Sequence, residues 1–391
     1  MNTARSRGPE YPGPRFRAAL LALAIFGAPT LAIGGCDHAG DGDARATSAK
    51  TGAAVPGNAA GSTKPAAART AGETADHDDT ATASPFPSLF FGKDDSAERR
   101  ALATAPIARI EKGKGGRTLA FKITLEDGTV GYYKPEQSFS GSHWYAELAS
   151  YYLDRELGIG RVPPAVGRVL PWKPLLDAAG DDERVSEITV QPDGTVRGAF
   201  IWWIPEDLER LPMGQGWETW VRVEGPLRIS PYQRPHEWKD DRNAGRATHP
   251  WPTPAGEPDT AGRPAELADM ILFDYLTTNV DRWGGENTNV RTRGAGGPLL
   301  YFDNGAGFTP GEARIPLTDA RLEGLQRFRK VTVDRMAALD PDHLRARMAT
   351  DPLAPVLSEK QFEHLSIRRA RLVEYTAALL KRFGDRALFP E

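Results

Sequence analysis

The sequence predicts an α+β domain with two lobes, because strand-like segments come first and helical segments come last. Between residues 107 and 204, runs rich in β-branched and aromatic residues alternate with turn residues. In the C-terminal third, apolar residues recur at helical spacing, at Leu372, Tyr375, Leu379 and Phe383. We therefore expect a mostly β N-lobe over residues 96–204, an irregular insertion over 205–263 and a helical C-lobe over 264–391.

Turn and stop residues delimit the expected elements. Glu126-Asp127-Gly128 is typical of a hairpin turn, and Gly158 is typical of a helix end. Strands are expected over residues 107–110, 118–125, 129–134, 165–169, 187–190, 195–204 and 299–302. Helices are expected over residues 142–157 and around the apolar series Leu267, Met270, Ile271 and Tyr275.

Composition excludes several classes of protein. Of the 391 residues, 40% are hydrophobic and 26% are charged, which is ordinary for a soluble globular protein. The formal net charge of -3 gives no reason to expect nucleic-acid binding, which favours a strongly basic domain. Cys36 is the one cysteine, so the chain can form neither an internal disulfide nor a zinc cluster built on thiolates.

The N-terminus is typical of an export signal. A basic start with Arg5, Arg7, Arg15 and Arg17 precedes an apolar run over residues 18–33. Ile33-Gly34-Gly35-Cys36 resembles the lipobox of bacterial lipoproteins, in which the cysteine is lipidated. We expect a signal peptide over 1–36 and a lipid anchor at Cys36 on the cell envelope, outside the cytoplasm. A plain signal peptide with an incidental cysteine is the alternative, and the choice of membrane stays open.

Residues 37–95 are dominated by Ala, Gly, Thr, Ser and Asp, with few large apolar side chains. Such a segment buries too little surface to offset the entropy of ordering it. The sequence therefore predicts a disordered stalk, with Phe86, Phe90 and Phe91 marking the approach to the folded domain.

Four features carry side chains suited to phosphoryl transfer, which requires charges placed around phosphates and a nucleophile held in line. Lys134 ends a predicted strand, and Glu147 lies in the helix that follows. Asp281 lies in Asn279-Val280-Asp281-Arg282, and Asp303 opens Asp303-Asn304-Gly305 after an apolar strand. Carboxylate and amide oxygens suit Mg²⁺ or Mn²⁺. A basic glycine-rich loop that could cover phosphates contains Lys112, Gly113, Gly115 and Gly116.

Each feature alone has an ordinary explanation. A lysine at a strand end is usually a solvated charge, a glutamate on an amphipathic helix usually lies on the surface, and Asp-Asn-Gly is usually a turn. The loop over residues 112–117 matches no standard nucleotide motif. The four features nevertheless occur in the order that they have in protein kinases, and this order favours a kinase.

Five segments resemble the secretory-pathway kinases related to four-jointed and the Golgi casein kinase: residues 146–158, 161–168, 268–282, 300–308 and 325–330. The resemblance implies an atypical protein-kinase-like fold that uses ATP, often with manganese, to phosphorylate secreted proteins or a sugar. It implies that Lys134 contacts nucleotide phosphates and that Glu147 pairs with it and helps to hold metal. It further implies that Asp281 is the catalytic aspartate and Asp303 the metal-binding one.

The sequence departs from that family in three places. The folded domain lacks the cysteines that form disulfides in the animal kinases. Residues 283–289 look more like bacterial toxin kinases and spore-coat kinases, which suggests Asn287 as a metal ligand, with Asn289 open as the alternative. The insertion over residues 205–263 has no counterpart in the family, so it leaves acceptor recognition undefined.

The leading hypothesis is therefore a metal-dependent kinase that phosphorylates a protein Ser/Thr or a glycan hydroxyl outside the cytoplasm. Transfer of AMP to a protein on the same fold is one alternative, since no ATP pool is obvious outside the cytoplasm. The other is an inactive, surface-anchored binding lipoprotein. Its recognition surface would be formed by Trp202, Trp203, Trp217, Trp220, Trp238 and Trp251, although ordinary packing explains these residues equally well.

Overall fold

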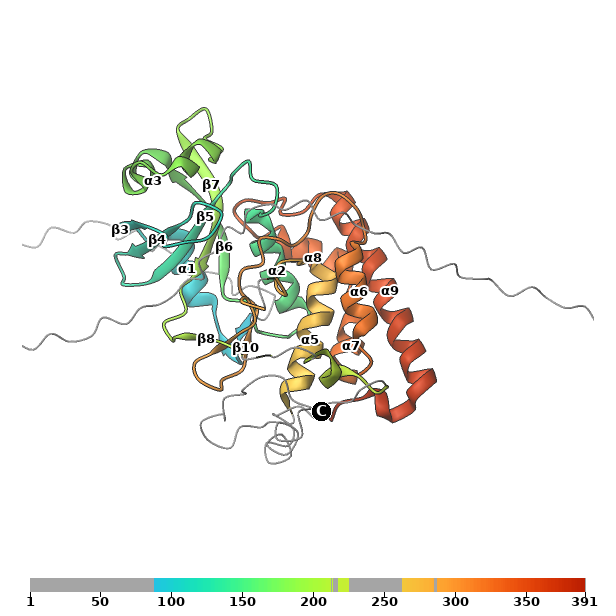
Figure 1. Cartoon of the computed structure of the whole chain (residues 1–391). Helices are drawn as coiled ribbons and strands as arrows, with labels where there is room; N and C mark the ends of the chain where they lie inside the picture. Colours follow the sequence, from blue (N-terminus) through green and yellow to red (C-terminus); the bar gives the residue numbers. More distant parts are fainter. Residues whose placement is uncertain (1–87, 212, 214–216, 225–261, 285–286, 391) are drawn as a thin grey trace, which may run out of the picture.

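The computed structural model describes residues 88–211, 213, 217–224, 262–284 and 287–390. Two lobes lie side by side, one built around a sheet and the other from helices (Figure 1). This confirms the predicted two-lobed α+β fold with a mostly β N-lobe and a helical C-lobe. The predicted signal peptide, Cys36 and most of the predicted stalk lie outside the described residues.

The N-lobe is a five-stranded antiparallel sheet in the order β3-β4-β5-β7-β6. Its strands are β3 (Ile107–Lys112), β4 (Phe121–Leu125), β5 (Val130–Pro135), β6 (Ala165–Pro171) and β7 (Thr195–Trp202). Phe121, Ile123, Tyr133 and Phe200 form the centre of its core. Helices α1 (Ser96–Thr104) and α3 (Trp172–Ala179) add Leu102 and Leu175 to this core. Two short strands, β1 (Leu89–Phe90) and β2 (Lys93–Asp94), precede α1 as a hairpin.

Helix α2 (Trp144–Glu156) connects the two lobes. Every residue from Ala146 to Arg155 is buried, including Glu147 and Asp154. Because this helix faces the sheet on one side and the C-lobe on the other, it has no solvent-facing stripe. The helix predicted over residues 142–157 is confirmed, and its burial exceeds that of an ordinary amphipathic helix.

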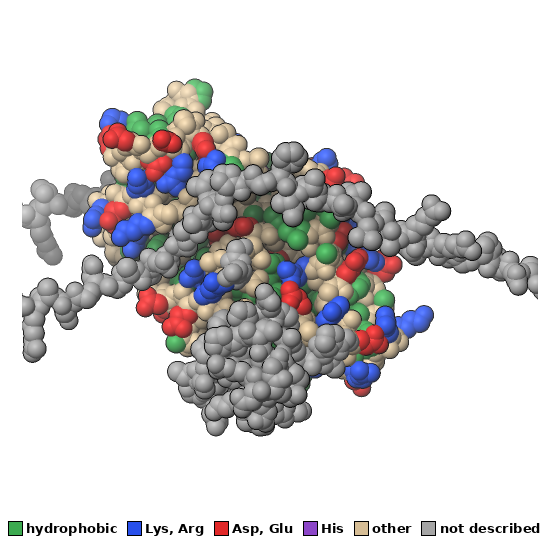
Figure 2. Space-filling view, viewed as in Figure 1, with side chains coloured by type: hydrophobic (Ala, Val, Ile, Leu, Met, Phe, Trp, Pro, Cys, Tyr) green, Lys and Arg blue, Asp and Glu red, His purple; other side chains and the backbone are tan. Residues whose placement is uncertain are grey.

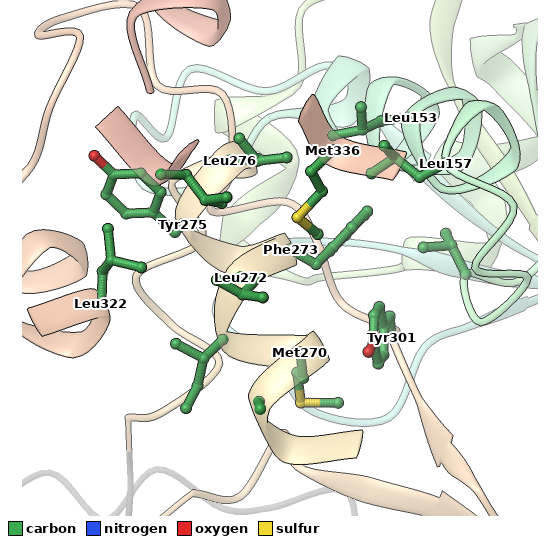
Figure 3. Close-up of a cluster of buried hydrophobic side chains, with 14 of the residues drawn as sticks. Leu153, Leu157, Met270, Leu272, Phe273, Tyr275, Leu276, Tyr301, Leu322 and Met336 are labelled. Carbon is green, nitrogen blue, oxygen red and sulfur yellow. The ribbon is translucent and has the colours of Figure 1, made fainter. Parts of the chain in front are cut away.

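The C-lobe packs around α5 (Gly262–Thr277), in which Met270, Leu272, Phe273 and Leu276 are at most 1% exposed. In Figure 3, Phe273 points toward Met336 of α7 and toward Leu153 and Leu157 at the end of α2, while Met270 lies near Tyr301. The remaining helices are α6 (Pro316–Gly324), α7 (Lys330–Ala337), α8 (Pro341–Met348), α9 (Glu359–Phe383) and the 3-10 turn η3 (Gly384–Ala387). Helix α9 begins at a capping box between Ser358 and Gln361, which satisfies two backbone N–H groups.

A small sheet in the order β10-β9-β8 lies below the main sheet and consists of β8 (Leu208–Arg210), β9 (Arg291–Arg293) and β10 (Leu299–Leu300). On the face shown in Figure 2, basic and acidic side chains of the described residues are interspersed over both lobes. None of the helices within the described ranges is long and apolar enough to cross a membrane.

Two expectations need correction. Residues 187–190 are not a strand; the segment is the 3-10 turn η1 (Glu183–Glu187) followed by a single bridge between Gln137 and Ile188. The Asp182 carboxylate accepts from the Arg184 backbone and pairs with its guanidinium, which stabilises the turn. The predicted stalk is also too long, because residues 88–95 are folded, with Phe90 and Asp95 at most 5% exposed.

The insertion contains more regular structure than expected. Strand β8 and the 3-10 turn η2 (Trp217–Val221) lie within residues 205–263, while residues 225–261 lie outside the described part of the chain. Trp217 stacks on Trp283 with ring centroids 4.9 Å apart, and both Trp217 and Trp220 are buried. Trp238 and Trp251 are outside the described residues.

Candidate active site

Lys134 lies at the end of β5 and points away from the N-lobe core. Side chains alternate along a strand, and the preceding Tyr133 is buried in the core, where its hydroxyl donates to the Val196 carbonyl. Lys134 therefore faces α2. Its Nζ lies 2.5 Å from Glu147 Oε1 and 2.6 Å from Asp303 Oδ1. Three residues that are distant in the sequence thus meet at one ammonium group.

Glu147 lies in the first turn of α2 and is 3% exposed. Its Oε1 accepts from Lys134, and its Oε2 accepts from the Asn304 backbone N–H at 3.0 Å. Both carboxylate oxygens are therefore satisfied, which is the condition for keeping a charged side chain buried. The helix is tied to the same loop by the His143 N–H, which donates to the Gly305 carbonyl at 2.7 Å.

Asp303 follows β10 in a left-handed conformation with φ 54°. An aspartate tolerates this region better than most residues because its short polar side chain can bond locally. The turn directs its carboxylate to Lys134 while leaving 42% of the side chain exposed. The charge of Lys134 is the main cause that holds the pKa of Asp303 below its ordinary value, so the carboxylate stays ionised.

Asp281 lies in the loop that follows α5, and the loop is folded by its own backbone and side chains. The Asn279 N–H donates to the Asp274 carbonyl, and Asn279 Oδ1 accepts from the Asp281 N–H at 3.3 Å. Asp281 is exposed, yet partial desolvation of its carboxyl and then the negative charge of Asp303 raise its pKa. A carboxylate with a raised pKa is a stronger proton acceptor.

Arg282 is fully buried and holds this loop in place through its guanidinium group. Its Nε lies 3.3 Å from both Asp274 carboxylate oxygens, its Nη2 donates to Asn304 Oδ1 at 2.6 Å, and its Nη1 contacts the Phe302 carbonyl. Arg282 and Asn304 were not predicted as site residues. Their adjacency to Asp281 and Asp303 was the available signal.

Asn289 is the asparagine that contacts Asp281. Its Nδ2 donates to Asp281 Oδ2 at 3.2 Å, so its amide lies beside the carboxylate. Asn287 instead shapes the turn, with φ 63° and an N–H that donates to the Gly284 carbonyl at 2.9 Å. Of the two asparagines suggested by the sequence, the structure brings Asn289 to the site.

The glycine-rich loop leaves the sheet at the end where Lys134 lies, because Lys112 pairs with Phe121 and Phe121 pairs with Tyr133. Gly115 and Gly116 both have positive φ, and the Gly116 carbonyl accepts from Arg184 Nη1 at 2.8 Å. Lys112 is paired with Asp182 at 3.2 Å. The loop is therefore held at its base by η1.

The donor set fits a hard cation that is shared with a polyphosphate. Within the described residues, no three His, Cys, Asp or Glu side chains form a ready-made metal cage. Mg²⁺-type ions are usually held by one or two carboxylates together with substrate phosphates, so no cage is required. After desolvation, the charge of Asp303 is the next cause that raises the pKa of Asp281, so the two carboxylates repel each other and a cation near them would be stabilised.

A strand lysine paired with a helix glutamate, a loop aspartate and an aspartate after a β-strand meet on a two-lobed fold. This combination defines the chain as an atypical kinase. The model of the family described as "Golgi casein kinase, C-terminal, Fam20" matches residues 222–387.

Two human proteins are similar along most of the chain. Glycosaminoglycan xylosylkinase of Homo sapiens is 22% identical over 326 residues, covering 74% of this chain and 76% of that protein. The extracellular serine/threonine protein kinase FAM20C of Homo sapiens is 24% identical over 319 residues, covering 70% of this chain and 52% of that protein.

A crystal structure of the Golgi casein kinase with Mn/ADP bound has a TM-score of 0.52 and 18% identity, and the match covers 76% of this chain and 79% of that chain. This likeness confirms the fold. Together, the matches make the chain similar to the Fam20 Golgi casein kinase-like proteins, among them xylosylkinase and four-jointed homologues. The resemblance inferred from the sequence is thereby confirmed.

Proposed function

We propose that the chain transfers the γ-phosphoryl group of ATP to a hydroxyl of a protein or a glycan, with Mn²⁺ or Mg²⁺. The observation that carries this proposal is the convergence of Glu147 and Asp303 on Lys134, at 2.5 and 2.6 Å, beside the exposed Asp281. Such an arrangement places charge where phosphoryl transfer needs it.

Lys134 is proposed to contact the nucleotide phosphates. Burial lowers the pKa of Lys134, but the charges of Asp303 and Glu147 outweigh burial and raise it, so the side chain stays cationic. Glu147 holds the ammonium in place because both of its oxygens are occupied. The loop that contains Lys112, Gly113, Gly115 and Gly116 is proposed to cover the phosphates from the same end of the sheet.

Asp281 is proposed to be the catalytic base. Its carboxylate accepts the proton of the acceptor hydroxyl as the hydroxyl oxygen bonds to the γ-phosphorus. The bond between that phosphorus and the β–γ bridging oxygen breaks, and ADP leaves with the electron pair. The exposure of Asp281 supports access for a second substrate, and its raised pKa supports proton acceptance.

Asp303 and the side-chain oxygen of Asn289 are proposed to hold the metal, and Glu147 to help hold it. The contact of Asn289 with Asp281 favours Asn289 over Asn287, which the sequence suggested. When bound, the ion would neutralise charge on the phosphate oxygens. The 42% exposure of the Asp303 side chain and its lowered pKa support a carboxylate that is available as a ligand.

The names of the relatives suggest the acceptor class. One is called a glycosaminoglycan xylosylkinase and another an extracellular serine/threonine protein kinase. A sugar hydroxyl or a Ser/Thr hydroxyl is therefore the acceptor that we propose.

We also propose that Cys36 is lipidated and anchors the kinase domain at the bacterial cell envelope, outside the cytoplasm. The support is the order of basic start, apolar run and Gly34-Gly35-Cys36. Incorporation of a labelled fatty acid that is lost in Cys36→Ser would support the anchor. Equal labelling of the two proteins would contradict it.

The enzymatic proposal is tested by incubating the full chain with ATP and Mn²⁺, alone and with candidate proteins or glycans. Intact-mass analysis distinguishes an added phosphate from an added AMP, and γ- and α-labelled ATP provide an independent check. Thermal stabilisation by ATP with Mn²⁺ that is lost in Asp303→Ala is the expected binding result. Absence of stabilisation in the wild type would contradict the proposal, and label from α-labelled ATP alone would indicate AMP transfer instead.

A further inference from the structure

Residues 88–95, which we call the N-terminal strap, form a hairpin that crosses the junction between the lobes. Strand β1 pairs with β2, and the Asp95 N–H donates to the Ser88 carbonyl at 3.1 Å, which closes the hairpin. In Figure 1 the strap is the cyan segment beside β8 and β10. It precedes α1 and contributes no side chain to the proposed catalytic set.

The open end of the hairpin, where Ser88 and Asp95 meet, is bound to α2 through buried polar contacts. Asp95 is 2% exposed, and its Oδ2 accepts from Arg155 Nη2 at 2.7 Å and Nε at 3.1 Å. Ser88 Oγ lies 2.5 Å from the Tyr151 hydroxyl, which in turn donates to Asp95 Oδ1 at 3.2 Å. Tyr151 and Arg155 lie about one and two turns after Glu147 on α2, so the strap is bonded to the element that carries Glu147.

The other end of the strap packs on the segment that leads into Asp303. Phe90 is 5% exposed and forms a small core with Leu300 and Ile204, against which Phe302 also packs. The neighbouring Phe91 N–H donates to the Gly160 carbonyl at 2.9 Å. Leu300 and Phe302 lie three and one residues before Asp303. The strap therefore touches both elements whose acids meet at Lys134.

The two elements meet where their acids converge on Lys134. Glu147 and Asp303 carry like charges, and the Lys134 ammonium between them offsets their repulsion. Their mutual position depends on how α2 sits against the β10–Asp303 segment. Direct links are the Asn304 N–H, which donates to Glu147 Oε2 at 3.0 Å, and the His143 N–H just before α2, which donates to the Gly305 carbonyl at 2.7 Å.

We propose that the N-terminal strap is a positioning element that holds α2 and the β10–Asp303 segment in a fixed relative position and so aligns Glu147 and Asp303 on Lys134. Phe90 and Asp95 are its two positioning residues, one for each element. The catalytic consequence rests on the proposed kinase function, whereas the structural consequence can be measured without it.

The test is hydrogen exchange of the full chain without nucleotide or metal. Phe90→Ser removes the contact with Leu300, and Asp95→Asn keeps the shape of the side chain while removing its charge. Leu89→Ser is the matched control, because Leu89 belongs to the same strand and is 48% exposed. We expect the two strap variants, but not the control, to accelerate exchange in peptides covering residues 303–308 by about tenfold, because local opening exposes the Asn304 amide.

Steady-state kinetics provide the second readout. We expect Phe90→Ser and Asp95→Asn to lower kcat by about tenfold, the equivalent of one small misalignment at the reacting centre, and Phe90→Leu to restore it. The metal concentration that gives half-maximal thermal stabilisation by ATP should rise in the two strap variants. Asp95→Asn keeps the test usable if Phe90→Ser does not fold.

Faster exchange confined to residues 88–104, with residues 303–308 unchanged, would show that the strap opens locally without holding the β10–Asp303 segment, and would overturn the proposal. If the wild type lacks transferase activity but the strap variants still accelerate exchange in residues 303–308, the kinase function is contradicted and the positioning role is supported. The two failures are therefore distinguishable.

Discussion

Arg282 Nη2 donates a hydrogen bond to Asn304 Oδ1 over 2.6 Å and so joins the residue after Asp281 to the residue after Asp303. The Asn304 N–H continues this connection to Glu147 Oε2 at 3.0 Å. A buried arginine thus ties together the loops that present the proposed base and the proposed metal ligand. The geometry of the site is set by residues that do not face the substrates.

Replacement of Arg282 by glutamine should destabilise the protein strongly. The substitution leaves Asp274 buried without its partner, and breaking a buried ion pair in this way costs about 3–5 kcal/mol. Urea unfolding followed by circular dichroism measures the change. Arg109→Gln is the control, because Arg109 and Glu111 are 70% and 42% exposed, and such a pair contributes at most about 1 kcal/mol. Equal effects of the two substitutions would contradict the role assigned to Arg282.

The sequence predicted the main elements of the site but not what holds them together. Lys134, Glu147, Asp281 and Asp303 could be predicted because each occupies a recognisable place on a strand, helix or turn. Arg282 could not, because the burial of an arginine depends on tertiary partners such as Asp274 and the Phe302 carbonyl. A residue of this type is usually expected at the surface.

Two further differences between the sequence predictions and the structure have a physical cause. The choice between Asn287 and Asn289 depended on a turn in which Asn287 takes positive φ, and spacing along the sequence cannot reveal a backbone conformation. The strap was assigned to the stalk because residues 37–95 as a whole contain few large apolar side chains, although Phe90 and Phe91 were expected to mark the approach to the folded domain. Its order comes from contacts such as Asp95 with Arg155, which is distant in the sequence.

Lys134→Met should both destabilise the protein and remove its interaction with the nucleotide. Glu147 would be left buried without its counter-ion, so we expect a loss of about 3–5 kcal/mol in the free energy of unfolding. Adding Glu147→Gln should recover part of this loss, because the remaining pair is neutral. Neither variant should be stabilised by ATP with Mn²⁺. Denaturant unfolding with and without nucleotide measures both effects, and Lys173→Met serves as an exposed control. A double variant less stable than Lys134→Met would argue against the pairing as described.

Asp281→Asn should separate chemistry from binding. The amide cannot accept the proton of the acceptor hydroxyl, so transfer should fall by about 10²–10⁴-fold. Thermal stabilisation by ATP with Mn²⁺ should stay close to that of the wild type, because Lys134 and Asp303 are unchanged. The two measurements are made on the same preparation. Turnover at the wild-type rate would show that another group is the base.

The transfer rate should fall at low pH, and Asn289 should affect the pH at which it falls. Asp281 must be ionised to act as a base, so kcat is lost as pH falls through its raised pKa, which lies above 3.8. The hydrogen bond from Asn289 favours the ionised form and lowers that pKa. Asn289→Ala should therefore move the acid limb to higher pH, measured as kcat at saturating ATP and metal.

The matched control is Asn287→Gly, because glycine accepts the positive φ of that position and removes the amide. It should leave the midpoint of the acid limb unchanged. A shift in Asn287→Gly with none in Asn289→Ala would reverse the assignment of the two asparagines.

Gly305 should tolerate no side chain while Ser142 keeps its hydroxyl. A Cβ at residue 305 would clash with Ser142 Oγ and lie 3.6 Å from Glu147 Oε1, so Gly305→Ala forces the Ser142 hydroxyl away from the loop that carries Asp303. We expect kcat to fall by about tenfold, in line with the effect of a small misplacement of catalytic groups. Gly305→Ala with Ser142→Ala should recover most of the rate, since the nearest remaining Ser142 atom is Cβ at 3.6 Å. Gly311→Ala, where no atom lies within 4 Å, should have no effect. A double variant as impaired as Gly305→Ala would show that the contact with Ser142 is not the cause.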